Sequence, residues 1–158
     1  MAVVGSNLTS GNSAVSGTSF QTASITPASN NLILASIIVY NTASTNPADP
    51  SLSGNGLTWV KVNSILYDNN SASRRKLFLY RALGTASAGV ITITTGETDA
   101  DVAWSVDQFL GTDTSGTNGS GAIVQSNTAA QLTSPTVTSL SVTLSALGSA
   151  GNATFGVF

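Results

Sequence analysis

The sequence predicts an all-β domain, a two-sheet, jelly-roll-like β-sandwich of about eight to nine strands. Almost every apolar segment is short, alternates with polar residues, and is bounded by Gly, Pro, Asn or Ser. No stretch keeps a helical period, and a length of 158 residues fits one domain. We expect residues 1–18 to form an N-terminal arm that can serve as an assembly strand, and residues 19–158 to form the sandwich.

Two strands and a long loop are expected in the first part of the chain. Residues 19–26 form the first expected strand, which ends at Pro27. Residues 32–40, LILASIIVY, are apolar on both faces, which is typical of a central strand covered on both sides. The turn-forming residues 41–56 predict an exposed loop.

A hairpin is expected in the middle of the chain. Residues 57–67 and 76–83 both have the character of strands, and the turn-forming stretch DNNSASRR separates them. In the first arm of this hairpin, Val60 and Val62 share one face, whereas Lys61 lies on the other.

Two alternating strands follow at residues 89–95 and 101–110. In the second of these, Trp104 points inward and Phe109 falls on the opposite face. A bulge near residues 107–108 would bring Phe109 inward.

Three further strands are expected toward the C-terminal end, at residues 122–126, 140–144 and 153–158. The predicted core takes its members from the inward positions of all these strands. They are Leu32, Leu34, Ile37, Val39, Val60, Val62, Ile91, Ile93, Trp104, Val106, Leu140, Val142 and Val157.

The composition argues against most enzyme classes. The chain has no Cys and no His, so neither a Ser-His-Asp centre nor a Cys-His centre can be built within it. The carboxylates are few, and Asp107, inside an expected strand, has no obvious partner for acid–base work. We therefore expect a protein that is not an enzyme.

The charges are sparse and nearly balanced, with five Lys and Arg against seven Asp and Glu. Nucleic acids and anionic membranes bind to basic surfaces, and a net charge of −2 indicates none. Neither is therefore expected as a partner. The longest apolar run is too short to span a bilayer as a helix, and residues 1–17 lack the features of a Sec signal peptide.

A calcium site is one interpretation of the acidic turn GETDAD. Its carboxylates come from Glu97, Asp99 and Asp101, and calcium prefers several oxygen ligands in flexible geometry. The alternative, which we favour, is a solvated turn at the end of a sheet. No other cofactor is expected.

Basic residues gather at the hairpin turn, where Arg74 and Arg75 are adjacent. They are candidates for docking against an acidic surface of a neighbouring subunit. Alternatively, they guard the edge of the hairpin against unwanted strand pairing, which is the simpler interpretation.

Aromatic residues offer a possible sugar-stacking platform, and β-sandwiches often carry such sites. The candidates are Trp59, Trp104, Tyr67, Tyr80 and Phe78. Core packing is the commoner role for aromatic residues inside alternating strands, and we favour it.

Assembly is the leading functional hypothesis, because a surface with few charges has little electrostatic self-repulsion. We expect a structural subunit that pairs with its own copies, or with other structural subunits, through strand edges. The apolar residues of the two termini are the candidate anchors, namely Val3, Val4 and Leu8, and Phe155, Val157 and Phe158. The alternative is a carbohydrate-binding or adhesive module with a glycan as its partner.

Three stretches, GNGLTWVKV, RRKLFLYRALG and AWSVDQFLGTDTSGTNGSGAIVQ, carry a resemblance. They resemble a β-sandwich module of uncharacterised bacteriophage virion proteins and bacterial surface proteins. The similar span runs from about Leu32 to Phe158. The resemblance implies a location in a virion or on an extracellular surface, as a decoration, tail, fibre or filament component, and it supplies no catalytic residues.

Overall fold

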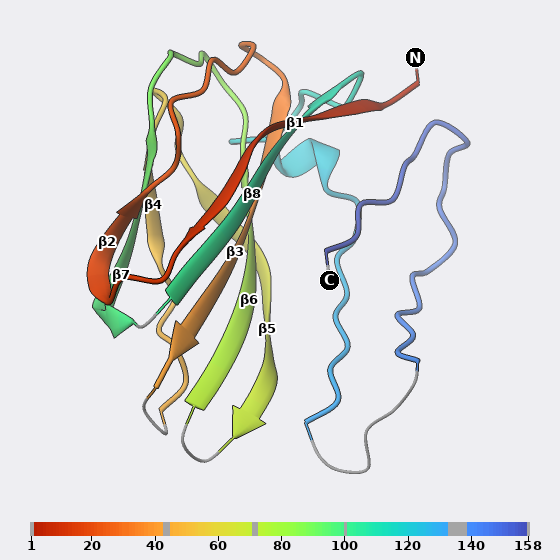
Figure 1. Cartoon of the computed structure of the whole chain (residues 1–158). Helices are drawn as coiled ribbons and strands as arrows, with labels where there is room; N and C mark the ends of the chain where they lie inside the picture. Colours follow the sequence, from red (N-terminus) through yellow and green to blue (C-terminus); the bar gives the residue numbers. More distant parts are fainter. Residues whose placement is uncertain (1, 43–44, 71–72, 100, 133–138, 158) are drawn as a thin grey trace.

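The computed structural model describes residues 2–42, 45–70, 73–99, 101–132 and 139–157. Within these ranges, eight strands in two antiparallel sheets confirm the predicted all-β sandwich (Figure 1). They are β1 (Val4–Ser13), β2 (Gly17–Gln21), β3 (Leu32–Asn41), β4 (Ser51–Gly54), β5 (Val60–Asn70), β6 (Ser73–Ala82), β7 (Ile91–Asp99) and β8 (Asp101–Leu110). One short 3-10 helix, η1 (Ser120–Ala122), follows β8. Within the described ranges, no helix is long and apolar enough to cross a membrane.

The two sheets differ in width. Sheet A has five strands in the order β1-β8-β3-β6-β5, and sheet B has three in the order β2-β7-β4. Figure 1 shows sheet B packed on one face of sheet A, with the rest of the chain after β8 running past the β5 side of the molecule. We call the face of sheet A that meets sheet B the inner face.

The core lies between the inner face of sheet A and sheet B. At its centre, Ile37 of β3 is flanked in register by Phe78 of β6 and Trp104 of β8. Ile91 and Ile93 of β7 close the core from sheet B, and both are fully buried. Successive side chains of a strand point to opposite faces, and this alternation directs Ile37 of β3 and Ile91 and Ile93 of β7 inward, as the sequence predicts.

The predicted core is partly correct. Val39 and Val106 belong to the buried cluster, and Trp104 packs against it. Leu32 and Leu34 are buried on the opposite, outer face, because alternation along β3 directs Ile33 inward instead. Three other members are not fully buried in the core: Val60 and Val62 are half-buried, and Val157 is half-buried in the C-terminal part of the chain.

Leu140 and Val142 are the clearest errors in the predicted core, because about half of each residue's surface is exposed, at 56% and 49%. The expected strands at residues 122–126, 140–144 and 153–158 are also wrong for the residues that the structure describes, since these segments belong to neither sheet. Alternation alone makes a strand only where another strand supplies backbone partners, and no described segment does so here.

Two strands of the sheets form where the sequence predicts an N-terminal arm and a loop. Residues 4–13, within the expected arm, form β1 and pair with β8. Ser51–Gly54, within the expected loop, forms β4 and pairs with β7.

Phe109 stays on the outer face. It pairs with Leu32 of β3 and Gly5 of β1, and the register of β8 on β3 runs without a break from Leu32 to Tyr40. The bulge that would bring Phe109 inward is absent from this pairing, and an irregularity lies in β1 instead, between Asn7 and Thr9.

Candidate assembly site

The strand edges on one side of the sandwich come together around a groove. β1 is an edge strand of sheet A and β2 is an edge strand of sheet B. The segment joining them carries Val15, which is 76% exposed. Between them lies a groove of about 450 Å³, which we call the β1/β2 groove, lined by residues that include Ser13, Ser19 and Gln21.

The floor of the β1/β2 groove is aromatic. Phe20 of β2 is buried, and Trp104 of β8 lies across the core beside it. The Trp104 ring lies against Gly11 of β1, where a Cβ atom would meet Cζ2 at 3.0 Å. The indole Nε1 is covered at this contact and has no hydrogen-bond partner among the described residues. All the lining residues are uncharged, so the groove suits an uncharged, partly apolar occupant.

The N-terminal anchor residues lie at the start and in the middle of β1, away from the end of this strand that lines the groove. Val4 is 58% exposed at the start of β1, and Val3 before it is half-buried. Leu8 packs against the core. The structure therefore holds this segment in its own sheet, with its outer edge free of any described strand.

The C-terminal part of the chain forms two extended arms that run antiparallel beside the outer face of sheet A (Figure 1). We define the first arm as residues 123–132 and the second arm as residues 139–152. Side chains of the first arm bind the backbone of the second. The Gln125 amide donates to Ser145 O at 2.9 Å and accepts from Ser145 N at 2.9 Å, and Asn127 Nδ2 donates to Thr143 O at 2.8 Å.

Both ends of this C-terminal region contact the body of the sandwich. Asn63 of β5 donates to Ser126 Oγ at 3.0 Å. Phe155 meets Phe109 edge-to-face, with ring centroids 5.3 Å apart. Val157 closes a pocket of about 170 Å³ over Ile38 and its neighbours on the outer face. Phe158, the last predicted anchor, lies outside the described residues.

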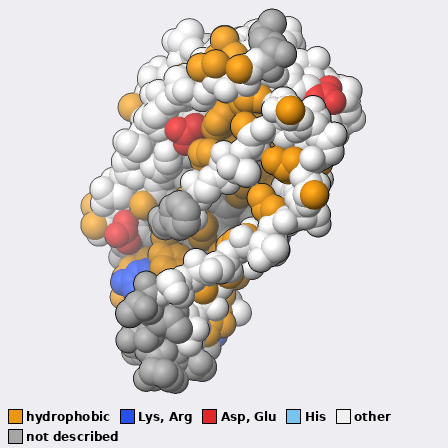
Figure 2. All heavy atoms as spheres, turned by 90° about the vertical axis from the view of Figure 1, so that its right-hand side faces the viewer, with side chains coloured by type: hydrophobic (Ala, Val, Ile, Leu, Met, Phe, Trp, Pro, Cys, Tyr) orange, Lys and Arg blue, Asp and Glu red, His pale blue; other side chains and the backbone are white. Residues whose placement is uncertain are grey.

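Apolar side chains remain exposed along the arms. Figure 2 looks onto this side of the molecule and shows hydrophobic side chains scattered around a hollow, with few charges. In the second arm, exposed apolar residues occupy every second position. They are Leu140, Val142 and Leu144.

The arginines of the hairpin turn bind within the chain. Arg74 Nη1 donates to Asn46 Oδ1 at 2.6 Å. The guanidinium of Arg75 lies over the Tyr40 ring, 4.4 Å from its centroid. These contacts fit the interpretation that the turn charges support this end of the hairpin. Neither contact supports docking of the arginines to a neighbouring subunit.

The acidic turn does not assemble a metal site in the described residues. Glu97 Oε1 accepts from Ala48 N at 2.9 Å, and Asp101 Oδ1 is buried without a hydrogen-bond partner in the described ranges. The Asp99 side chain lies outside the described part. Among described residues, no three acidic side chains group in a way that could hold a metal ion.

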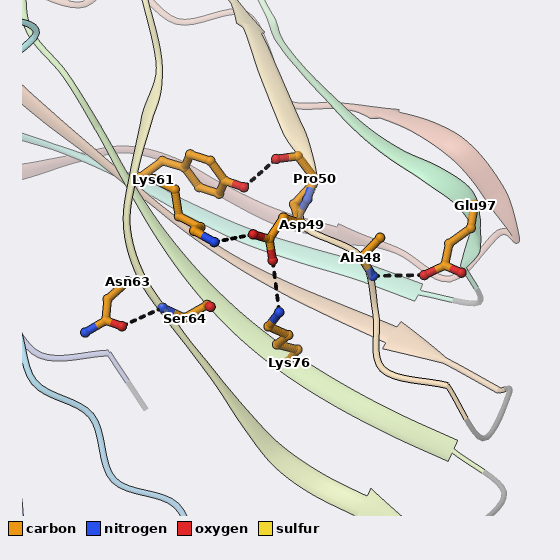
Figure 3. A network of polar contacts seen from close by, with 9 residues as sticks. Ala48, Asp49, Pro50, Lys61, Asn63, Ser64, Lys76 and Glu97 are labelled. Atoms are coloured by element: carbon orange, nitrogen blue, oxygen red, sulfur yellow. Dashed lines mark hydrogen bonds and ion pairs between the residues drawn. The ribbon is translucent and has the colours of Figure 1, made fainter.

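A charged cluster that the sequence did not predict joins the two sheets (Figure 3). Asp49, in the segment before β4, forms ion pairs with Lys61 of β5 and with Lys76 of β6, the latter at 2.9 Å. Hydrogen bonds from these two ammonium groups, Lys61 first, lower the pKa of Asp49. Beside them, the Tyr80 hydroxyl donates to Pro50 O, and burial, followed by the charge of Asp49, raises the pKa of Tyr80.

This cluster is structural in character. Asp49 and Lys61 are both substantially exposed, and such pairs contribute up to about 1 kcal/mol. The contacts fasten the segment before β4 to sheet A, which helps to hold sheet B in place. Residues so far apart in sequence could be paired only once the fold was known.

Asp107 also has structural partners. Asn7 Nδ2 donates to Asp107 Oδ1 and to Ser105 Oγ, both at 3.0 Å, and Ser105 Oγ donates to Asp107 Oδ2 at 3.0 Å. This network spans the irregularity in β1 and fixes β1 on β8.

Comparisons with protein-family models, with curated proteins and with solved structures found no match.

Proposed function

We propose that this protein is a non-enzymatic structural subunit that assembles with copies of itself, or with other structural subunits, through the edges of its sheets. The proposed setting is a virion, as a decoration, tail or fibre component, or an extracellular filament. The observation that carries the proposal is the outer edge of β1, ten residues long, uncharged and free of proline.

The edges on the two sides of the sandwich differ in a way that supports this proposal. β4 is four residues long, and β5 carries Lys61 and two interruptions of its register. Short edges, lysines and bulges are the usual means by which proteins prevent strand pairing. β1 carries neither a charge nor a proline, and its one irregularity is filled by the Asn7 side chain. Assembly through the β1/β2 side is therefore the better supported direction.

The distribution of charges supports the same direction. Asp49, Lys61 and Lys76 form their ion pairs away from β1. An incoming strand at β1 meets no charged side chain of that strand, and its backbone groups can pair with β1 on either side of the irregularity between Asn7 and Thr9.

A carbohydrate-binding function lacks a supporting observation. Of the five aromatic candidates, Tyr67 alone is exposed, at 36%. The other four are buried or pack against the core, namely Phe78, Tyr80, Trp59 and Trp104. A stacking surface needs aromatic faces that are open to solvent, so we propose no glycan site on these residues.

The proposal is tested by placing a lysine on each side of the sandwich. Ser10→Lys adds a charge to the exposed part of β1, and Ser53→Lys is the matched control on β4, whose Ser53 is also exposed. We expect the first variant to lose assembly and the second to retain it, as measured by light scattering and negative-stain electron microscopy. Equal assembly of both variants would contradict a role for the β1 edge.

A further inference from the structure

The sandwich has an unequal number of strands in its two layers, and one edge of the narrower layer lies at the β1/β2 groove. Sheet A has five strands and sheet B has three. The β1/β2 groove of about 450 Å³ adjoins the outer edge of β2, with Phe20 and Trp104 in its floor. A strand added to β2 would extend sheet B and cover these two aromatic side chains.

The second arm has the properties of a strand without a partner strand. Its residues 139–147 are exposed and not helical, and no described strand pairs with them. Leu140, Val142 and Leu144 alternate with small hydroxyl residues over residues 139–145. Such alternation gives an added strand one apolar face and one polar face.

We propose that residues 139–147 of one copy bind in the β1/β2 groove of a second copy, as an additional strand of sheet B beside β2. This inference rests on the proposed function, namely assembly through the edges of the sheets, and adds a second contact, whose acceptor is the edge of β2 beside the edge of β1. Leu140, Val142 and Leu144 face Phe20 and Trp104, and Ser141 and Thr143 lie outward. Neither the donated segment nor the groove lining carries a charge, so no ion is buried on binding.

The donor belongs to another copy because the arms of each chain are held away from their own groove. Asn63 and Ser126 fix the first arm beside β5, and Phe155 is fixed on Phe109 of the outer face. Figure 1 places the arms on the β5 side and β2 on the opposite side of the sandwich. Binding exchanges the three bonds from Gln125 and Asn127 for backbone bonds with β2.

The contact is heterologous, because the donor and the acceptor are different surfaces of the chain. Repetition of a heterologous contact gives a closed ring or an open filament, depending on the rotation between neighbours. This geometry agrees with the proposed particle or filament component.

Two aspartate variants of the full chain test the donor. Val142 is half exposed, so Val142→Asp is compatible with folding of the single chain. In the groove it would bury an unpaired carboxylate, and we expect the dissociation constant to rise by roughly 100-fold or more. The matched control, Ser141→Asp, lies outward and should change that constant by about threefold or less.

Cross-linking tests the acceptor, since the chain has no cysteine of its own. Ser19→Cys marks β2, and Ser141→Cys or Thr143→Cys marks the second arm. Mixing a β2 variant with an arm variant under mild oxidation should give a disulfide-linked dimer that neither gives alone, because neighbouring strands bring Cα atoms within disulfide range.

The outcomes separate this inference from the proposed function. Assembly that survives Val142→Asp and yields no mixed dimer would overturn strand donation and leave edge assembly standing. A cross-link that forms only when both cysteines are in one chain would assign the groove to the chain's own arm. A monomer that yields no mixed dimer at any concentration would overturn both proposals.

Discussion

The indole ring of Trp104 lies directly against the backbone of Gly11, its register partner on β1. A Cβ atom at residue 11 would meet Cζ2 of the ring at 3.0 Å. Gly11 therefore lets an edge strand with little apolar content close over a large core residue. The same contact sets the floor of the β1/β2 groove, so the packing of β1 and the proposed assembly surface depend on each other.

Enlarging residue 11 should loosen β1. Gly11→Val forces the Trp104 ring or the β1 backbone to move, and overpacking of this kind costs about 1–3 kcal/mol. Chemical denaturation should show this loss, and hydrogen exchange should show faster exchange in β1. Ser10→Val, at the exposed neighbouring position, is the control and should change the free energy of unfolding by less than about 0.5 kcal/mol. Equal effects of both variants would contradict the close contact.

Two truncations to alanine should separate the core from the arms. Ile37 is fully buried between Phe78 and Trp104, so Ile37→Ala should lower the free energy of unfolding by about 2–5 kcal/mol. Leu140→Ala, in the exposed second arm, should change it by less than about 0.5 kcal/mol when measured on the monomer. A large loss for Leu140→Ala would mean that the arm packs in the core, as the sequence alone predicts.

The Asp49 cluster should give a small, pH-dependent contribution to stability. The ammonium groups of Lys61 and Lys76 lower the pKa of Asp49, so its folded-state pKa lies below the unfolded value. The contribution is therefore present above the unfolded pKa and disappears as the pH falls through the folded pKa. Asp49→Asn should lower stability by up to about 1 kcal/mol at neutral pH.

The difference between this variant and the parent should vanish in acid and shrink at high salt. Thermal unfolding of the two proteins across the acidic range measures it. A constant difference at all pH values would show that the carboxylate charge is not its source.

Chelation of calcium should leave the melting temperature unchanged. Glu97 already accepts a hydrogen bond from Ala48 N, and the described acidic residues form no group suited to a metal ion. Melting with EDTA and with added calcium measures this directly. A rise in the melting temperature on addition of calcium would restore the site proposed on Glu97, Asp99 and Asp101.

The sequence predicts those parts of the fold in which local alternation and tertiary packing agree. β3, β7 and β8 lie close to where the pattern places them, because their alternate residues face one continuous core. β1 is harder to predict, because its Gly-, Ser- and Asn-rich sequence has little strand propensity and its order comes from the distant residues Trp104 and Phe109.

The arms show the opposite difficulty. Residues 140–144 alternate as well as any strand, yet they lie outside the sheets in the described structure. Alternation shows that a segment can pair, and the fold decides whether a partner is present. The candidate site could not be predicted from the sequence for the same reason. The β1/β2 groove depends on the edges of β1 and β2, which are brought together only in the folded chain.

Sedimentation velocity of the unmodified chain, over a wide range of concentration and at low and high salt, tests the central claim most directly. Edge assembly predicts species heavier than the 15.9 kDa chain that grow with concentration. It also predicts that they persist at high salt, because the pairing surfaces carry no charge. A single 15.9 kDa species under all these conditions would contradict the account.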